Sequence, residues 1–373
     1  MPFLMKRFCF LLPYLYGSKL HKREKSYEKD LFPCYIFCQY GAKRRQKRHT
    51  EQKCAEQESA VTEKGVIMYK VLCLNNISQV GLQHLTNEFE ITDDIQQADA
   101  ILVRSADMLS MDIPSNVKVI ARAGAGYNNI PTEALAQRGV PVFNTPGANA
   151  NGVKELVLCG MLLAARDVLG GIAWCKENAE DPAIGKSAEK AKKAFAGGEI
   201  LGKTLGVIGL GAIGKLVAKS AEALGMKIIG YDPYLPADAA AAICENLTFT
   251  TNLDELYENS DYLTIHVPAM EGTIGMIDAQ AIAHMKQGCV FLNFSRDTLV
   301  DAPAMTQALA SGKVRKYITD FATPEVMAMK NAIVLPHLGA STAESEDNCA
   351  IMAVEDVMTY LKTGKRNHCV NMK

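Results

Sequence analysis

The stretch that most constrains the fold of this chain is "VIGLGAIG", residues 207–214, which holds Gly209, Gly211 and Gly214. A strand-like run precedes it, a helical stretch follows it, and Asp232 ends the next strand-like run. In such a motif the first glycine makes a tight turn, the second lets a pyrophosphate approach the backbone, and the third lets the helix pack on the strand. The order of these parts predicts a βαβ unit whose helix N-terminus binds a dinucleotide.

Asp232 predicts which dinucleotide binds. Its carboxylate can accept hydrogen bonds from both ribose hydroxyls of an adenosine, and its charge would repel a 2′-phosphate. The segment "YDPY", residues 231–234, holds no Arg or Lys that could pair with such a phosphate. We therefore expect NAD rather than NADP as the cofactor.

Strand-like and helical segments alternate along most of the chain. The first series of strand-like runs covers residues 69–75, 98–104, 117–122 and 140–144. The second series has six runs, at residues 204–208, 226–231, 261–267, 288–293, 316–320 and 332–335. A helix of about six turns begins at Asn149, and the closing helix has Ser341 and Glu344 at capping-box spacing. The pattern predicts an α/β protein with two doubly wound parallel-sheet domains, Rossmann-like and flavodoxin-like, and a cleft between them.

Residues 1–67 differ in composition from the rest of the chain. They carry 14 Lys and Arg against 7 Asp and Glu, a net charge of +7, whereas residues 68–373 have a net charge of −8. The basic run Lys43–His49 is typical of a solvated segment, and the apolar start lacks a signal-peptide cleavage site. We expect translation to begin at Met68, with residues 1–67 as a translated leader. The metal-ligand types in this segment fit no standard zinc spacing, and we predict no metal site; they are Cys34, Cys38, His49 and Cys54.

The cysteines after Met68 bear on the compartment. There are seven, mostly in apolar runs, which is typical of free, buried thiols in a reducing cytoplasm. No apolar run reaches the roughly 18 residues of a membrane-spanning helix. We expect neither a membrane nor a nucleic-acid partner.

Several strand-like runs of the second series end in residues suited to a cleft, in the segments 265–268, 293–301, 319–325 and 334–340. Ligands of doubly wound sheets bind outside the carboxyl ends of the strands, so these ends should converge. Hydride transfer from an alcohol needs a base for the hydroxyl proton, and histidine suits that task near neutral pH. A hydroxy acid would also need a bidentate carboxylate partner, which arginine provides. A carboxylate behind the histidine would orient its ring.

Residues 68–373 resemble the D-isomer-specific 2-hydroxyacid dehydrogenase family, and within it the pattern is most similar to short-type D-3-phosphoglycerate dehydrogenases. The resemblance rests on "RAGAGYNNI", the glycine motif, "NFSRDTLVD" and "PHLGAST". It implies an NAD-binding domain at residues 150–338 and a substrate-binding domain made of residues 68–149 and 339–373. It also implies a homodimer that forms through the cofactor domain and the long helix after Asn149.

The resemblance implies three catalytic residues. Arg296 would bind the substrate's carboxylate and carbonyl, His337 would act as acid and base, and Glu325 would pair with the histidine. The chain departs from the family pattern in two places: it reads "DFATPEV" where D-V-F-x-x-E-P is usual, and Asp297 replaces a common glycine.

The resemblance also implies the remaining cofactor contacts. Ala212 and Ile213 would lie at the pyrophosphate, and Val267, Phe294 and Asp320 around the ribose and nicotinamide, with Asp320 accepting from the carboxamide. The full predicted cofactor set is Gly209, Gly211, Ala212, Ile213, Gly214, Asp232, Val267, Phe294, Ser295, Asp320, Gly339 and Ala340.

Arg104 and Arg122 each end a strand-like run of the first series. Two arginines facing the cleft would suit a phosphate, besides the carboxylate on Arg296. The backbone N–H groups of Ala123 and Gly124 could hold the substrate carboxylate as well. We expect oxidation of a phosphorylated 2-hydroxy acid, 3-phosphoglycerate, the first step of serine synthesis.

Two alternatives remain open. One is a dehydrogenase for another 2-hydroxy acid, such as glycerate, hydroxypyruvate or lactate, in which Arg104 and Arg122 have no ligand. The other is an NAD-sensing corepressor-type binding protein with the same fold. Because the chain ends at Lys373, after the closing helix, we also expect it to lack the C-terminal regulatory domain of longer relatives.

Overall fold

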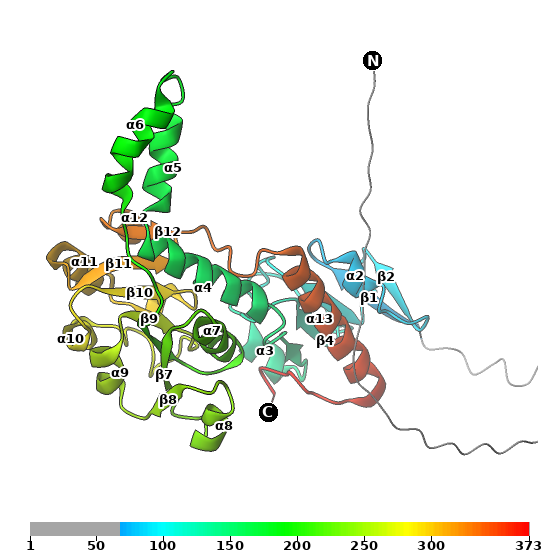
Figure 1. Ribbon diagram of the computed structural model, residues 1–373. Coiled ribbons are helices and arrows are strands. Elements are labelled where there is room, and N and C mark those ends of the chain that lie inside the picture. Colours follow the sequence, from blue (N-terminus) through cyan, green and yellow to red (C-terminus); the bar gives the residue numbers. More distant parts are fainter. Residues whose placement is uncertain (1–67, 373) are drawn as a thin grey trace, which may run out of the picture. The chain divides into compact units, whose positions relative to one another are not determined.

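The computed structural model describes residues 68–372, which lie within one unit, Val66–Lys373 (Figure 1). The expectations for residues 1–67, namely the leader, the basic run and the cysteine set, lie outside the described residues.

The first sheet has five parallel strands in the order β2-β1-β3-β4-β5. Ser78 caps the short helix that follows β1, because its side chain accepts a hydrogen bond from the N–H of Val80. The strand order is that of flavodoxin-like sheets, with the topological switch point between β1 and β3. The elements are β1 (Tyr69–Cys73), α2 (Gln79–Leu82), β2 (Phe89–Thr92), β3 (Ala100–Val103), β4 (Val119–Arg122), α3 (Thr132–Gln137) and β5 (Val142–Phe143).

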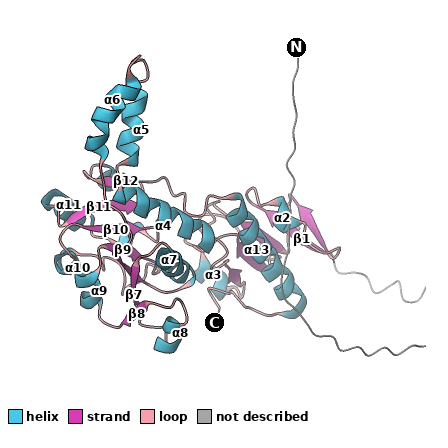
Figure 2. Cartoon of the chain, viewed as in Figure 1, coloured by secondary structure: helices cyan, strands magenta, loops and turns pink. Residues whose placement is uncertain are grey.

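The second sheet has seven parallel strands in the order β12-β11-β10-β9-β6-β7-β8, a Rossmann-like order with its switch point between β6 and β9. Helices connect its strands, as Figure 2 shows, and the two sheets confirm the predicted fold class. The strands are β6 (Thr204–Ile208), β7 (Lys227–Tyr231), β8 (Leu247–Thr250), β9 (Tyr262–Ile265), β10 (Cys289–Asn293), β11 (Val314–Thr319) and β12 (Ala332–Val334). The helices are α7 (Ala212–Ala223), α8 (Ala237–Ala241), α9 (Leu253–Asn259), α10 (Ala279–His284), η2 (Asp297–Leu299), α11 (Ala302–Ser311) and α12 (Pro324–Met327).

The sequence pattern missed two strands, β2 and β8, so the prediction of six strands in the second series is wrong by one. Each is the last strand at one edge of its sheet. An edge strand is less enclosed than a central one and needs no continuous apolar run. In β2 only Phe89 is buried, and the remaining residues are half-buried or exposed.

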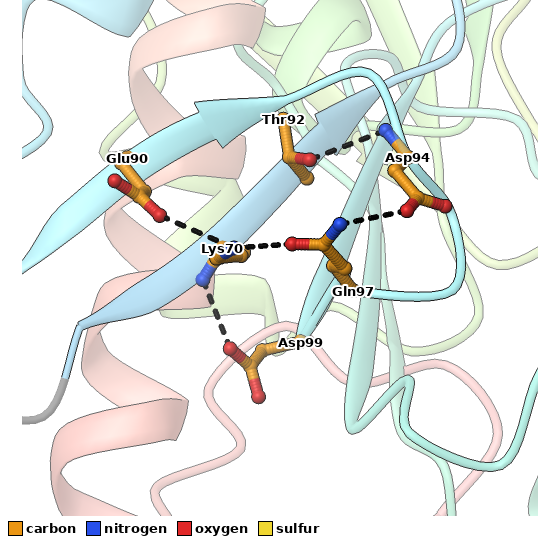
Figure 3. Close-up of polar contacts among 6 residues, drawn as sticks. All are labelled: Lys70, Glu90, Thr92, Asp94, Gln97 and Asp99. Atoms are coloured by element: carbon orange, nitrogen blue, oxygen red, sulfur yellow. Dashed lines mark hydrogen bonds and ion pairs between the residues drawn. The ribbon is translucent and has the colours of Figure 1, made fainter.

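A polar network fixes the turn that follows β2 (Figure 3). Lys70 on β1 donates to the side-chain oxygen of Gln97 at 2.5 Å, and Gln97 donates to Asp94 at 2.8 Å. The N–H of Asp94 donates to the Thr92 hydroxyl at 3.2 Å, and Lys70 lies 3.6 Å from Glu90. These contacts hold the connection from β2 to β3 against β1.

The long helix predicted from Asn149 is two helices, α4 (Ala150–Ala165) and α5 (Val168–Glu177), bent by 70°. Arg166 is extended, and the Asp167 carboxylate caps α5 by accepting from the N–H of Gly170 at 3.1 Å. This cap satisfies a donor at a new helix start, which apolar periodicity alone does not reveal. Within residues 68–372 no single helix is long and apolar enough to cross a membrane; only the bent pair α4 and α5 together meets that test of length and composition.

After the bend the chain forms what we call the arm, residues 168–195. It consists of α5, α6 (Ile184–Ala191) and a 3-10 turn, η1 (Lys192–Phe195). In Figure 1 α5 and α6 lie side by side, away from the strands of either sheet. Neither helix has a buried residue.

The closing helix α13 (Ala343–Thr363) packs on the first sheet. Its predicted cap, Ser341, is wrong by one residue, because the N–H of Ser341 belongs to a turn with Leu338 and Thr342 caps the helix instead. Buried residues of α13, among them Ala350, share a core with residues of the first sheet such as Val71. Buried residues of α4 belong instead to a core with the second sheet.

All seven cysteines in the described residues are free thiols. Cys244, Cys289 and Cys349 are buried, as expected. Cys159 and Cys175 are exposed, contrary to expectation, because Cys159 lies off the buried face of α4 and α5 has no buried residue at all.

Candidate active site

The predicted cofactor residues all follow carboxyl ends of strands in the second sheet. Parallel strands place these ends on one edge of the sheet, so residues far apart in sequence lie along it. Gly209 to Gly214 follow β6, Asp232 follows β7 and Val267 follows β9. The others follow β10, β11 and β12, and are Phe294, Ser295, Asp320, Gly339 and Ala340.

The glycine loop after β6 fits a pyrophosphate. Gly209 has φ +90°, and a Cβ there would lie 2.7 Å from the carbonyl oxygen of His266. A Cβ on Gly214 would lie 1.9 Å from the Gly209 carbonyl oxygen, whereas nothing stands within 4 Å of one on Gly211. The loop is therefore tightly packed at Gly209 and Gly214, where the helix meets the strand. It is open at Gly211, where a phosphate would approach the N-terminus of α7.

Asp232 lies at the end of β7 and holds the same loop. Its carboxylate accepts from the N–H of Leu210 at 2.9 Å and from that of Tyr234 at 3.0 Å. Each carboxylate oxygen has a second lone pair free for a ribose hydroxyl.

His266 lies beside the glycine loop, but its surroundings do not suit a catalytic base. Burial lowers its pKa to about 3, which makes it a poor base near neutral pH. Its Nε2 lies 3.0 Å from the Thr264 hydroxyl, and its Nδ1 has no partner among residues 68–372. The other histidines outside the cleft within residues 68–372 each lie beside a carboxylate; they are His84, His284 and His368.

One cavity of about 460 Å³ brings the predicted chemical groups together. Arg104, Arg122 and Arg296 line it, together with His337. Ala123, Gly124 and Ala340 from the predicted sets also line it, whereas Glu325 does not. The sequence pattern missed several polar or aromatic lining residues: Asn128, Asn149, Asp297, Phe321, Ser345 and Glu346.

Arg122 is held firmly in this cavity. Its Nε donates to the carbonyl of Arg104 at 3.1 Å, and its guanidinium fills the space where a Cβ on Gly124 would lie, 2.0 Å from Nη1. Burial lowers the pKa of the Arg122 guanidinium, and the charges of Arg296 and Arg104 lower it further. The three cations are therefore close enough to interact, and a bound anion would relieve their repulsion.

Arg296 follows β10 in a turn that buried Asn293 holds. The Asn293 amide donates to the carbonyl of Arg296 at 2.7 Å, and its oxygen accepts from the N–H of Ser295 at 3.1 Å. The Arg296 Nη1 donates to the carbonyl of Ser295 at 2.6 Å, and its Nη2 would contact a Cβ on Gly126 at 2.8 Å. The absence of a side chain on Gly126 thus leaves room for the guanidinium.

His337 has a left-handed backbone, with φ +57°, which is uncommon outside glycine. Asp320, at the end of β11, holds it there. The carbonyl of Asp320 accepts from the N–H of His337 at 3.0 Å, and its carboxylate accepts from the N–H groups of Leu338 and Gly339 at 2.7 Å each. Asp320 is 2 % exposed, so these hydrogen bonds are shielded from water.

Glu325 and His337 form no ion pair or hydrogen bond with each other in the described residues. The His337 ring instead forms a T-shaped contact with the Phe321 ring, with ring centroids 5.4 Å apart. Glu325 lies in the first turn of α12 and lines a separate cavity, which Phe321 also lines. Hydrogen bonds from its own N–H and from the Thr323 hydroxyl lower the pKa of Glu325.

The backbone N–H groups proposed for the substrate carboxylate already have acceptors. The N–H of Ala123 donates to the carbonyl of Val103 at 2.8 Å, as part of the first sheet. The N–H of Gly124 donates to the carbonyl of Arg122 at 2.9 Å. The sheet hydrogen bonds thus extend one residue beyond β4 to Ala123, whereas the N–H of Gly124 closes a tight turn onto its own segment, so a substrate carboxylate would have to share these donors.

Known proteins resemble this chain over most of its length. A family model described as "D-isomer specific 2-hydroxyacid dehydrogenase, NAD binding domain" matches residues 158–339. A D-3-phosphoglycerate dehydrogenase from Methanocaldococcus jannaschii is 36 % identical over 308 residues, which are 80 % of this chain and 56 % of that protein. A hydroxypyruvate reductase from Thermotoga maritima is 37 % identical over 296 residues, 76 % of this chain and 91 % of that protein.

A solved structure gives a similar picture. The NAD-bound 3-phosphoglycerate dehydrogenase of Entamoeba histolytica is 27 % identical, has a TM-score of 0.65, and is matched over 82 % of this chain and 99 % of its own. The chain spans about half the length of the M. jannaschii enzyme. The NAD-binding family model and the fit of the glycine loop together identify NAD as the cofactor. This chain belongs to the D-isomer-specific 2-hydroxyacid dehydrogenase family.

Proposed function

We propose that the chain oxidises 3-phosphoglycerate to 3-phosphohydroxypyruvate, the first step of serine biosynthesis. The observation that carries this proposal is the gathering of Arg104, Arg122 and Arg296 around one cavity of about 460 Å³. A substrate with a phosphate and a carboxylate has two anionic groups to pair with them.

Two helix N-termini add to the positive field of the cavity. Asn149 precedes α4 and lines the cavity without capping the helix with its side chain. Ser345, in the first turn of α13, lines it as well. Each helix N-terminus carries partial positive charge, which favours a ligand that carries more than one negative charge.

In the proposed reaction, Arg296 binds the substrate carboxylate, and a ring nitrogen of His337 accepts the proton of the C2 hydroxyl. NAD, when bound along the strand ends, supplies the acceptor for the hydride from C2. Asp320 fixes the backbone of His337 and so fixes the direction from which its ring meets the hydroxyl. Arg104 and Arg122 bind the phosphate, and Glu325 remains a proposed partner of His337 that a bound substrate would have to bring closer.

A second candidate is the oxidation of an unphosphorylated acid such as glycerate, or the reverse reduction of hydroxypyruvate. One observation favours it: the carboxylates of Asp297 and Glu346 also line the cavity and offset two of the three cations. The relative named hydroxypyruvate reductase is in keeping with this alternative.

We further propose the cytoplasm as the compartment, because all described cysteines are free thiols.

A second copy of the chain is the proposed partner. On α5, Val168, Leu169 and Ile172 are 44–49 % exposed. An apolar groove of about 430 Å³, lined by Trp174 and Phe195 among others, runs along the same arm. Isolated helices with an exposed apolar face are marginal in water, so a second arm packed on the first would stabilise both.

The substrate test is steady-state turnover of the full chain with NAD and either 3-phosphoglycerate, glycerate or lactate. We expect NADH formation with 3-phosphoglycerate, and much slower formation with the two unphosphorylated acids. Arg104→Ala removes a charged hydrogen-bond donor and should raise the KM for 3-phosphoglycerate by about 10- to 100-fold. Arg138→Ala, outside the cavity, is the control and should leave the KM unchanged. Equal rates on glycerate and 3-phosphoglycerate would reject the phosphorylated substrate, and NAD binding without turnover would reject the enzyme.

Asp320→Asn tests how His337 is held. The NH2 group of the asparagine would replace one carboxylate oxygen and point a donor at a backbone N–H. The loop 337–339 should therefore shift, and kcat should fall about 100-fold. Asp301→Asn is a matched control, since Asp301 also accepts from a backbone N–H, at the start of α11, but lies outside the cavity. The NAD dissociation constant, measured by calorimetry, should rise by about tenfold or less, because Asp320 and Gly339 also belong to the predicted cofactor set. A large rise in that constant with kcat unchanged at saturating NAD would show that Asp320 serves the cofactor alone.

The proposed dimer predicts the mass of the particle in solution. Light scattering after gel filtration should give about twice the chain mass of 40.6 kDa. Replacing Leu169 and Ile172 together by Asp should give a monomer, because two buried charges would oppose the packing of the arms. Leu109→Asp, an exposed leucine (59 %) near the first sheet, should leave the dimer intact. A wild-type monomer at micromolar concentration would contradict the proposal.

A further inference from the structure

Glu346 is a negative charge in a cavity that otherwise gathers cations. Its Oε1 lies 2.8 Å from Nη1 of Arg104. The two residues come from distant parts of the chain, since Arg104 follows β3 and Glu346 lies in the first turn of α13. Both line the cavity that Arg122 and Arg296 also line.

The helix macrodipole alone does not account for this placement. Acidic residues are common in a first helical turn because they offset its partial positive charge. Glu344 already occupies that turn, is exposed, and does not line the cavity. Glu346 differs from it because its carboxylate pairs with a cation that the proposed substrate needs.

The pair is able to exchange partners. The side chains of Arg104 and Glu346 are 35 % and 41 % exposed, so water screens their attraction and the pair contributes little to the stability of the fold. A phosphate dianion carries more charge than a carboxylate and offers three acceptor oxygens, so it can displace Glu346 from Arg104. Arg122 offers no such exchange. Its Nε donates to the carbonyl of Arg104, and within the described residues it has no carboxylate partner that a phosphate could displace.

We propose that Glu346 is a specificity-determining residue that competes with the substrate's second anionic group for Arg104. The inference rests on the proposed function, because it assigns the phosphate to Arg104. Glu346 weakens the binding of every phosphorylated ligand by a constant factor and leaves acids with a single carboxylate, bound at Arg296, unaffected. It thereby sets how strongly the cleft prefers phosphorylated over unphosphorylated acids.

Binding of 3-phosphoglycerate, inorganic phosphate and glycerate to the full chain, measured by calorimetry, tests the proposal without turnover. Glu346→Gln keeps the shape and an acceptor oxygen but removes the charge. It should bind 3-phosphoglycerate and phosphate roughly three- to tenfold more tightly, since one screened charge pair is lost. Its affinity for glycerate should stay within about twofold of the wild-type value. The control Glu344→Gln, in the same turn, should change none of the three affinities.

A double-mutant cycle separates competition from a structural role. In an Arg104→Ala background, Glu346→Gln should no longer change the affinity for 3-phosphoglycerate. Unchanged or weaker binding of both phosphorylated ligands by Glu346→Gln alone would overturn the proposal, and would mean that Glu346 only holds Arg104 in place. If the wild-type chain oxidises glycerate but not 3-phosphoglycerate, the proposed function fails, whereas the phosphate affinities of the two variants still decide whether Glu346 competes for Arg104.

Discussion

The buried carboxylate of Asp320 is the contact on which the rest of the site depends. Asp320 accepts hydrogen bonds from three consecutive backbone N–H groups. Its carbonyl accepts from His337, and its carboxylate accepts from Leu338 and Gly339. Without them the left-handed backbone of His337 would cost energy with nothing to offset it. Because Asp320 directly follows β11, a strand paired on both sides, the backbone of His337 is positioned by the second sheet as well as by the loop that carries it. That rigidity would serve the role proposed for His337, which requires its ring to meet one hydroxyl group from one direction.

The charges of the cleft follow from the same placement of residues at strand and helix ends. Arg104 follows β3 and Arg122 ends the neighbouring strand β4 of the first sheet, whereas Arg296 follows β10 of the second. Partial burial, and with it repulsion by Arg296 and Arg104, lowers the pKa of Arg122, and a bound anion would relieve that repulsion. Glu346 and Asp297 offset part of that charge. The balance between them bears on whether a phosphorylated or an unphosphorylated acid binds better.

Much of the fold could be predicted because parallel strands buried on both faces are continuous apolar runs, and Gly209, Asp232 and His337 stand where such runs end. The edge strands β2 and β8 could not, since their polar alternation resembles that of a loop. The break at Arg166 was also missed, because periodicity continues across it while the Asp167 cap acts locally. In the site, the sequence predicted several residues that line the cavity, but it did not predict which side chains contact each other. Nothing in the spacing shows that the His337 ring meets Phe321, or that Glu346 reaches Arg104 from 242 positions away in the sequence.

The central claim is that this cleft removes hydrogen from C2 of an anionic 2-hydroxy acid. The most direct measurement follows an isotope, using 3-phosphoglycerate that carries deuterium on C2. Mass spectrometry of the reduced cofactor should then find the deuterium in NADH, and the rate should fall relative to the unlabelled substrate where hydride transfer limits turnover. Unlabelled NADH from the deuterated substrate, with the deuterium left in the product or released to water, would contradict the claim.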